Sequence, residues 1–276
     1  MKIKFSKMHG LGNDFMVIDG INQSIALTPK LISSWADRHF GVGFDQLLLV
    51  EVAESEKALF KYRIFNADGG EVTQCGNGAR CFARFVREQG LTEQTRIPVE
   101  TSNGLLELNV IDDSQVQVDM GVPNFEPASI PFIAPERETV YQLKINGELI
   151  VFSAVSIGNP HAVILVEDVD SADLRYMGPA LQAHAAFPQS VNVGCMQIID
   201  NQHFNLRVYE RGSGETLACG SGACAAMAVG RVLELLDTQA VASLPGGELQ
   251  LDWQGEGKPV IMTGSTEMVY QGEIKL

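Results

Sequence analysis

Residues 70–79 read Gly70-Glu71-Val72-Thr73-Gln74-Cys75-Gly76-Asn77-Gly78-Ala79, and residues 214–223 read Gly214-Glu215-Thr216-Leu217-Ala218-Cys219-Gly220-Ser221-Gly222-Ala223, with six of the ten positions identical. In each copy a cysteine opens a Gly-rich turn that leads into a predicted helix. A chain built from two such halves can present two thiols to one substrate from opposite sides. This arrangement suits the transfer of a proton across the plane of a carbon atom.

The similarity extends beyond these ten residues. At the offset of the two cysteines, 219 − 75 = 144, Arg63-Ile64-Phe65-Asn66 aligns with Arg207-Val208-Tyr209-Glu210. At an offset of 146, Gly12-Asn13 aligns with Gly158-Asn159, and Gln46 aligns with Asn192. Coincidence is the alternative in a chain with 27 glycines, but the landmarks keep the same order. The period is too long for a solenoid, so we interpret the halves as two related domains.

Composition narrows the class of protein. The 276 residues are enough for one or two domains with substantial cores, and no run of 18 apolar residues predicts a membrane span. The N-terminal residues lack the apolar stretch of a signal peptide. A net charge of −14 argues against a nucleic-acid partner, because phosphate binding requires a basic face. The charge also disfavours a simple anionic substrate unless a local pocket overrides the global field.

The cysteines favour a reducing compartment over a metal site. There are five, at positions 75, 81, 195, 219 and 224, and an odd number without a secretion signal predicts a cytoplasmic protein. Their spacings are C-x5-C and C-x4-C, and only His161 and His203 offer nearby additional ligands. We therefore expect no metal, and in particular no zinc site.

Strand patterns dominate the chain. Alternating or continuous apolar residues predict strands at 2–7, 16–18, 47–52 and 59–65. Two-residue hairpin turns are predicted at Asn103-Gly104 and Asn146-Gly147, more weakly at Gly246-Gly247, and a further turn at Asp112-Asp113.

Four helices are expected. Thr28 and Pro29 form a typical helix start, followed by an apolar stripe to Ala36. The others are predicted at about 77–90, 171–185 and 221–236. Residues 223–229 are apolar on every side, which predicts a helix buried all round, and the repeat implies the same for 79–86.

These elements predict an α+β protein of two pseudo-symmetric domains, each a curled, mostly antiparallel sheet wrapped around a central helix. We expect an N-terminal domain over 1–120, completed by a C-terminal strand at 265–276, and a C-terminal domain over 121–264. The Pro-containing segment 121–135 is interpreted as the connection between them.

Both Cys-Gly-x-Gly-Ala turns combine an acid/base group with an anion site. A helix N-terminus carries unpaired N–H groups and partial positive charge, so a cysteine there is expected to be more acidic than a free thiol, whose pKa is about 8.5. The same N–H groups can hold a carboxylate and lower the cost of the charge that forms when an α-proton leaves. One thiolate and one thiol on opposite faces of that carbon fit racemisation.

No cofactor is predicted for this chemistry. The sequence contains no lysine in a convincing Schiff-base setting and no dinucleotide or P-loop fingerprint. The alternative for Cys75 and Cys219 is a structural role as small residues at tight turns, but their paired context favours catalysis. Cys81, Cys195 and Cys224 are interpreted as structural thiols.

Specific motifs along the whole chain resemble the diaminopimelate epimerase family. They are His9-Gly10-Leu11-Gly12-Asn13-Asp14-Phe15, Phe65-Asn66-Ala67-Asp68-Gly69, Cys75-Gly76-Asn77-Gly78-Ala79-Arg80-Cys81, Gly158-Asn159-Pro160-His161, Tyr209-Glu210-Arg211-Gly212 and Cys219-Gly220-Ser221-Gly222. Proline racemases share the two-cysteine plan, but their flanking motifs differ. The resemblance implies a pyridoxal-independent enzyme that interconverts LL-2,6-diaminopimelate and the meso form in lysine and peptidoglycan biosynthesis.

The resemblance also assigns residue roles. The acid/base pair falls on Cys75 and Cys219, and His161 and Glu210 are implied to modulate their pKa values. A tyrosine similar to Tyr270 is associated with dimerisation, so a homodimer is expected. The implied substrate contacts are Asn13, Gln46, Asn66, Gly76, Asn77, Asn159, Asn192, Glu210, Arg211, Gly220 and Ser221.

The residue chemistry agrees with a substrate that has two amino-acid ends. Asn66, Asn159, Asn192 and Arg211 offer donors for a distal carboxylate, and Glu210 offers a charge for an ammonium group. The alternatives are turn roles for the asparagines, a structural role for His161 and a surface ion pair for Arg211. For the whole protein, the alternatives are a racemase for another amino acid, a thiol oxidoreductase and an amino-acid-binding protein.

Overall fold

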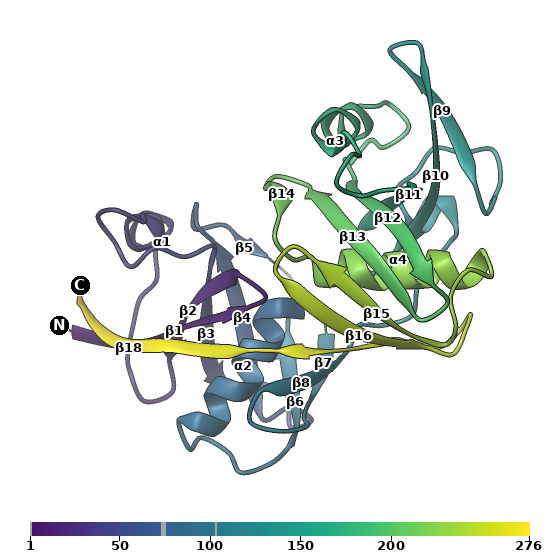
Figure 1. Ribbon diagram of the computed structural model, residues 1–276. Coiled ribbons are helices and arrows are strands. Elements are labelled where there is room, and N and C mark those ends of the chain that lie inside the picture. The colour runs from purple at the N-terminus through teal and green to yellow at the C-terminus, as the bar shows by residue number, and fades with distance from the viewer. Residues whose placement is uncertain (1, 73–75, 103) are drawn as a thin grey trace. The chain divides into compact units, whose positions relative to one another are not determined.

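The computed structural model describes residues 2–72, 76–102 and 104–276. The chain divides into two compact units, which we call the first unit (Met1–Asp119 with Thr263–Leu276) and the second unit (Met120–Met262). Each unit is an α+β structure in which a mixed sheet contacts a long helix (Figure 1).

The strands of the first unit follow a regular order of pairing. They are β1 (Lys2–Gly10), β2 (Asn13–Asp19), β3 (Gln46–Val52), β4 (Phe60–Asn66), β5 (Glu71–Val72), β6 (Arg96–Thr101), β7 (Gly104–Val110), β8 (Gln115–Asp119) and β18 (Glu267–Lys275). β18 pairs antiparallel with β1, and β1 with β2, while β2 and β3 are parallel. β3 is antiparallel to β4, which also pairs antiparallel with β5 and parallel with β6. β6–β7 and β7–β8 are antiparallel.

The second unit repeats this order. Its strands are β9 (Tyr141–Ile145), β10 (Glu148–Ser156), β11 (Pro160–Leu165), β12 (Asn192–Asp200), β13 (His203–Glu210), β14 (Gly214–Thr216), β15 (Gln239–Leu244) and β16 (Gly247–Trp253), and β17 (Val260–Ser265) leads back to the first unit. β10–β11 is antiparallel, β11–β12 parallel and β12–β13 antiparallel. β13 pairs antiparallel with β14 and parallel with β15, and β15–β16 is antiparallel. The pseudo-symmetry predicted from the sequence is therefore present in the topology.

The strand register carries the repeat down to single residues. In the first unit Phe15 pairs with Gln46, which pairs with Asn66 across the next strand. In the second unit His161 pairs with Asn192, at the same offset of 146 from Phe15 and Gln46. Polar residues therefore occupy matching strand ends in both units.

A central helix packs against the sheet in each unit, as predicted. The helices are α1 (Pro29–Ala36), α2 (Gly76–Glu88), α3 (Leu174–Gln182) and α4 (Gly220–Val232), with a 3-10 turn η1 at Pro127–Ser129. α2 contacts β1, β2, β3, β7 and β8, and α4 contacts β10 to β13, β15 and β16. Residues 223–229 of α4 are all buried, because they are apolar on every face.

Of the helix cap and the hairpin turns predicted from short sequence motifs, some are confirmed and one is displaced. Thr28 caps α1 by accepting a hydrogen bond from Leu31 N at 3.3 Å, and Asn146-Gly147 forms the β9–β10 turn with φ angles of 53° and 92°. Asn103 lies outside the described residues. The third glycine hairpin was placed one residue too far along, because Leu244 pairs with Gly247 and the turn is Pro245-Gly246.

Two predicted segments differ in extent or role. The third helix is shorter than 171–185, since Asp173 caps it by accepting from Tyr176 N at 3.1 Å. The segment 121–135 is not a free connection. Ile130 and Phe132 are buried in the second unit's core, where Phe132 stacks on Phe187 with ring centroids 4.7 Å apart. Apolar residues between the prolines explain this packing.

Candidate active site

In the first unit, three predicted substrate contacts gather at one edge of the sheet. Asn13 begins β2 and Gln46 begins the parallel strand β3, while Asn66 ends the antiparallel strand β4. Gln46 Nε2 donates to Asn66 Oδ1 at 2.9 Å, and the buried Gln46 Oε1 has no partner among the described residues. The strand order thus brings these amides together.

The N-terminus of α2 adds the fourth contact. The helix begins at Gly76, and Asn77 in its first turn donates from Nδ2 to Asn13 Oδ1 at 3.3 Å. Cys75, predicted as one of the two catalytic thiols, lies outside the described residues. The glycine two positions into the helix, Gly78, packs so tightly that an added Cβ atom would meet the Tyr62 hydroxyl at 2.7 Å.

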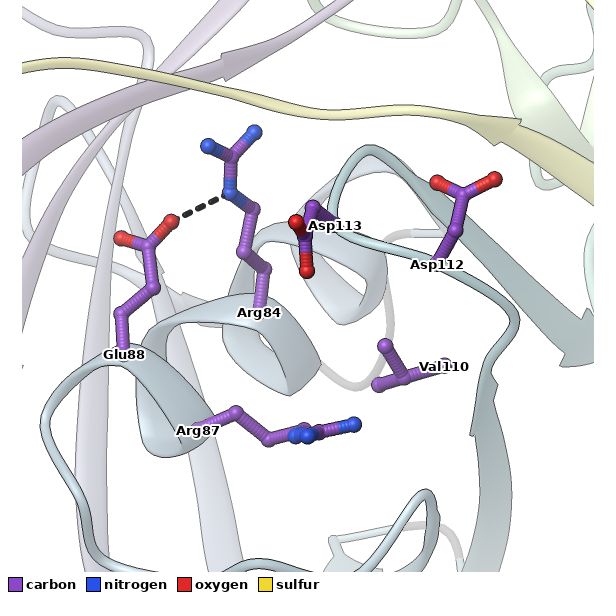
Figure 2. A pocket seen from close by; sticks show the side chains of 6 residues that line it. All are labelled: Arg84, Arg87, Glu88, Val110, Asp112 and Asp113. Atoms are coloured by element: carbon purple, nitrogen blue, oxygen red, sulfur yellow. Dashed lines mark hydrogen bonds and ion pairs between the residues drawn. The ribbon is translucent and has the colours of Figure 1, made fainter.

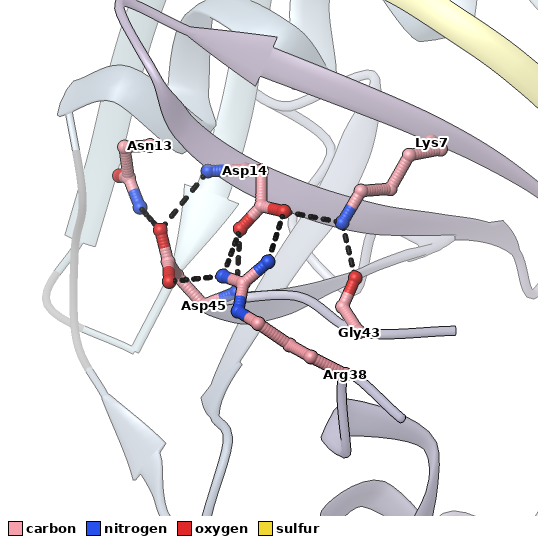
Figure 3. A network of polar contacts seen from close by, with 6 residues as sticks. All are labelled: Lys7, Asn13, Asp14, Arg38, Gly43 and Asp45. Carbon is pink, nitrogen blue, oxygen red and sulfur yellow. Dashed lines mark hydrogen bonds and ion pairs between the residues drawn. The ribbon is translucent and has the colours of Figure 1, made fainter. Parts of the chain in front are cut away.

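A network of charged side chains lies next to Asn13 (Figure 3). Arg38 binds both carboxylate oxygens of Asp14, at 2.8 and 3.0 Å, and Asp45 at 2.7 Å. Lys7 bonds to Asp14 and to the Gly43 carbonyl. Burial favours a raised pKa for Asp14, but the hydrogen bonds and charges of Arg38 and Lys7 outweigh it and lower that pKa to about 2.

In the second unit, Cys219 occupies the N-cap position of α4, where its sulfur accepts a hydrogen bond from Gly222 N at 3.4 Å. Ser221 Oγ lies 3.7 Å from the same sulfur, and Cys219 is only 3% exposed. The helix thus begins with a thiol held against donors, as the Cys-Gly-x-Gly pattern predicted.

The prediction that the pKa of Cys219 lies below that of a free thiol was wrong. Burial raises the pKa of the Cys219 thiol well above its usual range, and the charge of Glu210 and a hydrogen bond to it raise it further. Hydrogen bonds from Ser221 and Gly222 act in the opposite sense without prevailing. Cys219 therefore rests as a thiol that donates to Glu210.

Glu210, at the end of β13, is held by a residue that the sequence analysis missed. Thr216 Oγ1 donates to Glu210 Oε1 at 2.6 Å. β14 brings Thr216 there, because this short strand pairs with β13 and Val208 faces Thr216. Only its place inside the repeated ten-residue segment could have drawn attention to Thr216.

A directed chain of hydrogen bonds runs from His161 to Cys219. His161 Nε2 lies 3.0 Å from Asn159 Oδ1, and Asn159 Nδ2 donates to Ser221 Oγ at 3.3 Å. Because an amide oxygen only accepts, Nε2 carries the imidazole hydrogen. Ser221 accepts from Asn159, which leaves its own hydrogen available for the Cys219 sulfur.

His161 is neutral in this arrangement. It is 1% exposed, and burial, followed by the positive charge of Arg211, lowers the pKa of His161 to about 3. A charged imidazole so close to a guanidinium group is disfavoured. His161 therefore acts at physiological pH as an uncharged hydrogen-bond donor.

Asn192 and Arg211 complete the second unit's set. The buried Asn192 accepts from Arg211 N through Oδ1 at 2.8 Å, and Arg211 Nη1 donates to the Gln189 carbonyl at 2.8 Å. Gly220 is the first residue of α4. The structure thus brings together, within the second unit, every residue predicted for that half.

The remaining residues singled out in the sequence belong to neither cluster. Tyr270 is on β18, 44% exposed, with its ring edge-on to Phe5. Cys81, Cys195 and Cys224 are buried, and burial raises the pKa of Cys195 to about 11. A pocket on the first unit contains none of the predicted site residues (Figure 2); its lining is Arg84, Arg87, Glu88, Val110, Asp112 and Asp113.

The described residues contain neither a helix able to span a membrane nor a cluster of metal-binding side chains. None of the helices in residues 2–72, 76–102 and 104–276 is long and apolar enough to cross a membrane. Within the same ranges, no group of three or more His, Cys, Asp or Glu side chains could hold a metal ion.

Solved structures of the same fold define the class. A hydroxyproline epimerase from Agrobacterium vitis, with bound trans-4-hydroxy-L-proline, matches with a TM-score of 0.73 over 99% of this chain and 92% of its own, at 14% identity. A Bacillus anthracis phenazine biosynthesis protein of the PhzF family matches with a TM-score of 0.70 over the whole of both chains, at 19% identity. At these identities the likeness establishes the fold, a two-unit α+β architecture found in epimerases.

Sequence similarity then gives the family. The diaminopimelate epimerase profile matches residues 5–126 and 153–269. Curated diaminopimelate epimerases from Nitrosomonas europaea and Chromobacterium violaceum are 57% and 55% identical to this chain, and each alignment covers 100% of both proteins. The chain belongs to the diaminopimelate epimerase family.

Proposed function

We propose that the protein interconverts LL-2,6-diaminopimelate and meso-diaminopimelate by moving the α-proton between two thiols, those of Cys75 and Cys219. The observation that carries the proposal is the setting of Cys219. This buried thiol lies at a helix N-terminus, donates to a carboxylate, and belongs to a chain of the diaminopimelate epimerase family. The step serves lysine and peptidoglycan biosynthesis.

Proton transfer is proposed to use one thiol from each unit. A thiolate on one face of the α-carbon removes its proton, while the thiol on the other face delivers a proton to the same carbon. The first sulfur ends protonated and the second ends as thiolate, so the reverse reaction exchanges the roles. Cys219 suits the role of acid at the start, because Glu210 and burial favour its protonated form.

The thiolate that forms at Cys219 also has partners. Gly222 N donates to the sulfur at 3.4 Å, and the Ser221 hydroxyl lies at 3.7 Å. Both hydrogen bonds stabilise the charged sulfur, and both lower its pKa. Burial with few but well-placed donors brings the two protonation states closer in free energy than burial alone allows.

Substrate recognition is proposed to use the amide-rich strand ends of both units. Asn13, Gln46, Asn66, Gly76 and Asn77 are the proposed contacts in the first unit. Asn159, Asn192, Glu210, Arg211, Gly220 and Ser221 are those in the second. Gln46 Oε1, which has no hydrogen-bond partner among the residues that the structure describes, suits an ammonium group, and buried groups of this kind reject substrates that lack the partner.

We propose further that catalysis needs no pyridoxal phosphate and that the enzyme is a cytoplasmic homodimer. Thiol chemistry of this kind requires reduced cysteines, and Cys219 is present in the structure as a thiol that forms no disulfide with the described residues. Tyr270 supports the dimer, since it and Val269 are exposed on β18, 44% and 55% respectively.

The test is an incubation of pure, reduced protein with LL-diaminopimelate in heavy water, without any added cofactor. We expect the meso isomer to appear with one deuterium at the inverted α-carbon. If folded, reduced protein shows no isomerisation and no exchange of the α-proton, the epimerase function is excluded. Reaction with another amino acid alone would change the substrate assignment, and a thiol oxidoreductase would show no α-deuterium.

A further inference from the structure

We propose that Asp45 is a positioning residue that fixes the amide orientation of Asn13 and, through it, that of Asn77. The inference rests on the proposed function, in which both asparagines contact the substrate. Asp45 immediately precedes Gln46 at the start of β3 and lies between Asn13 and Arg38 (Figure 3). It was not among the residues predicted from the sequence.

The chemistry of the carboxylate sets the orientation. Asp45 Oδ2 lies 3.0 Å from Asn13 Nδ2 and, as an ionised acceptor, it can only receive a hydrogen bond. The NH2 group of Asn13 must therefore face Asp45. Its carbonyl oxygen is left to accept from Asn77 Nδ2, 3.3 Å away.

Asp45 is itself fixed on several sides. Arg38 donates to its Oδ1 at 2.7 Å, and its own backbone N–H donates to Asp14 Oδ1 at 2.9 Å and to the Asp14 carbonyl at 3.0 Å. The backbone N–H of Asp14 donates back to Asp45 Oδ2 at 3.2 Å. The two segments that begin β2 and β3 are thus joined at the position of the Asn13 amide.

The second unit provides an internal comparison. Asn159, the repeat partner of Asn13, has the opposite orientation: its Nδ2 donates to Ser221 and its Oδ1 faces His161 Nε2. The position that corresponds to Asp45 in the second half, 45 + 146 = 191, is Val191. Equivalent asparagines are therefore oriented by different neighbours, a carboxylate in one unit and an imidazole N–H in the other.

The variant Asp45→Asn isolates this role. The introduced amide keeps its oxygen on the Arg38 guanidinium, because its NH2 group cannot face a cation that only donates. Its NH2 group then faces Asn13 and the backbone N–H of Asp14, which loses its acceptor. Asn13 must turn its oxygen toward the new NH2 group and its own NH2 group toward Asn77. We expect KM for diaminopimelate to rise about tenfold, as for one lost hydrogen bond, with kcat changed less than about threefold.

Two control variants separate positioning from folding. Asp19→Asn changes a carboxylate at the other end of β2 that accepts from Asn22 Nδ2 at 2.7 Å, so KM should stay at the wild-type value. Arg38→Met removes the anchor but leaves the Asp45 carboxylate, so we expect a lower Tm with a smaller change in KM. A KM for Asp45→Asn within about twofold of wild type, or no larger than that of Arg38→Met, overturns the proposal.

A spectroscopic measurement tests the orientation without the reaction. In protein labelled with ¹⁵N-asparagine, the side-chain amide signals of Asn13 and Asn77, identified by their loss in Asn13→Ala and Asn77→Ala, should move in Asp45→Asn and not in Asp19→Asn. Unmoved signals overturn the proposal. If wild-type protein fails to epimerise diaminopimelate while these signals move, the proposed function fails and the positioning by Asp45 stands.

Discussion

At the scale of single residues, the two site clusters orient equivalent asparagines, Asn13 and Asn159, with different neighbours. Each places an asparagine beside the N-terminus of a buried helix, but one is oriented by Asp45 and the other by His161. At the position where the first cluster has Asn66, the second has an acid, Glu210. The halves therefore differ in charge at a position where their strand pairing matches.

Replacing Cys219 by alanine should abolish both epimerisation and α-proton exchange, because the sulfur is the proposed proton carrier of the second unit. The expected loss is at least about 10³-fold in kcat, measured with a chiral assay of the two isomers. Cys195→Ala, which changes another buried thiol, should keep kcat within about threefold. Wild-type rates in Cys219→Ala would contradict the two-thiol scheme.

Stability should depend on pH through His161. The unfolded imidazole binds a proton below about pH 6.5, whereas the folded pKa is about 3, so unfolding takes up a proton and stability falls as pH decreases through 6.5. In His161→Phe, which copies Phe15 of the first unit, this contribution is absent. Urea unfolding between pH 7.5 and 5 should show a pH slope smaller by up to about 1.4 kcal/mol per unit. Equal slopes would show that His161 is not held neutral.

At the scale of elements, the beginning of each central helix is built around a glycine. An added Cβ at Gly78 would meet the Tyr62 hydroxyl at 2.7 Å, and one at Gly222 would lie 3.0 Å from Val208 Cγ2 and 3.2 Å from Cys219 Sγ. These two positions are related by the repeat offset of 144. Close packing of helix against sheet, rather than backbone freedom, explains both glycines.

Alanine at either glycine should therefore destabilise the protein, although alanine is the better helix former by about 1 kcal/mol. Overpacking costs about 1–3 kcal/mol, so after the gain in helix propensity we expect a net loss of up to about 2 kcal/mol in urea unfolding for Gly78→Ala. Gly222→Ala should lose less stability but more activity, because the new methyl group displaces the Cys219 sulfur. A variant more stable than wild type would contradict the packing argument.

The sequence predicted the elements whose signals are local. The Thr28 cap, the Asn146-Gly147 turn and the buried α4 each depend on neighbouring residues alone, and the repeat supplied the matching α2. It could not predict the direction of the Cys219 pKa shift, because its causes, burial first and then Glu210 from β13, both arise from tertiary packing. The network around Asp45 was missed for a related reason, because its members come from separate segments of the chain. The repeat gave no hint of it either, since the position that corresponds to Asp45 in the second half is Val191.

At the scale of the whole molecule, the account depends on two copies of one architecture. The order of strand pairing is the same from β1 to β7 and from β10 to β16, and the sequence Cys-Gly-x-Gly stands in each copy where the central helix begins. A duplicated unit of this kind supplies two similar acid/base groups from one chain. The two halves nevertheless differ at corresponding positions, such as Asn66 in the first and Glu210 in the second.

The most direct test of the two-thiol mechanism is the early distribution of deuterium. LL-diaminopimelate is converted in heavy water, and both isomers are recovered before about a tenth of the substrate has reacted. Two carriers on opposite faces predict deuterium at the inverted carbon of the meso product and none in the remaining LL substrate. Product that retains the original proton, or substrate labelled as fast as product, would contradict the account, since both outcomes require a single group to remove and return the proton.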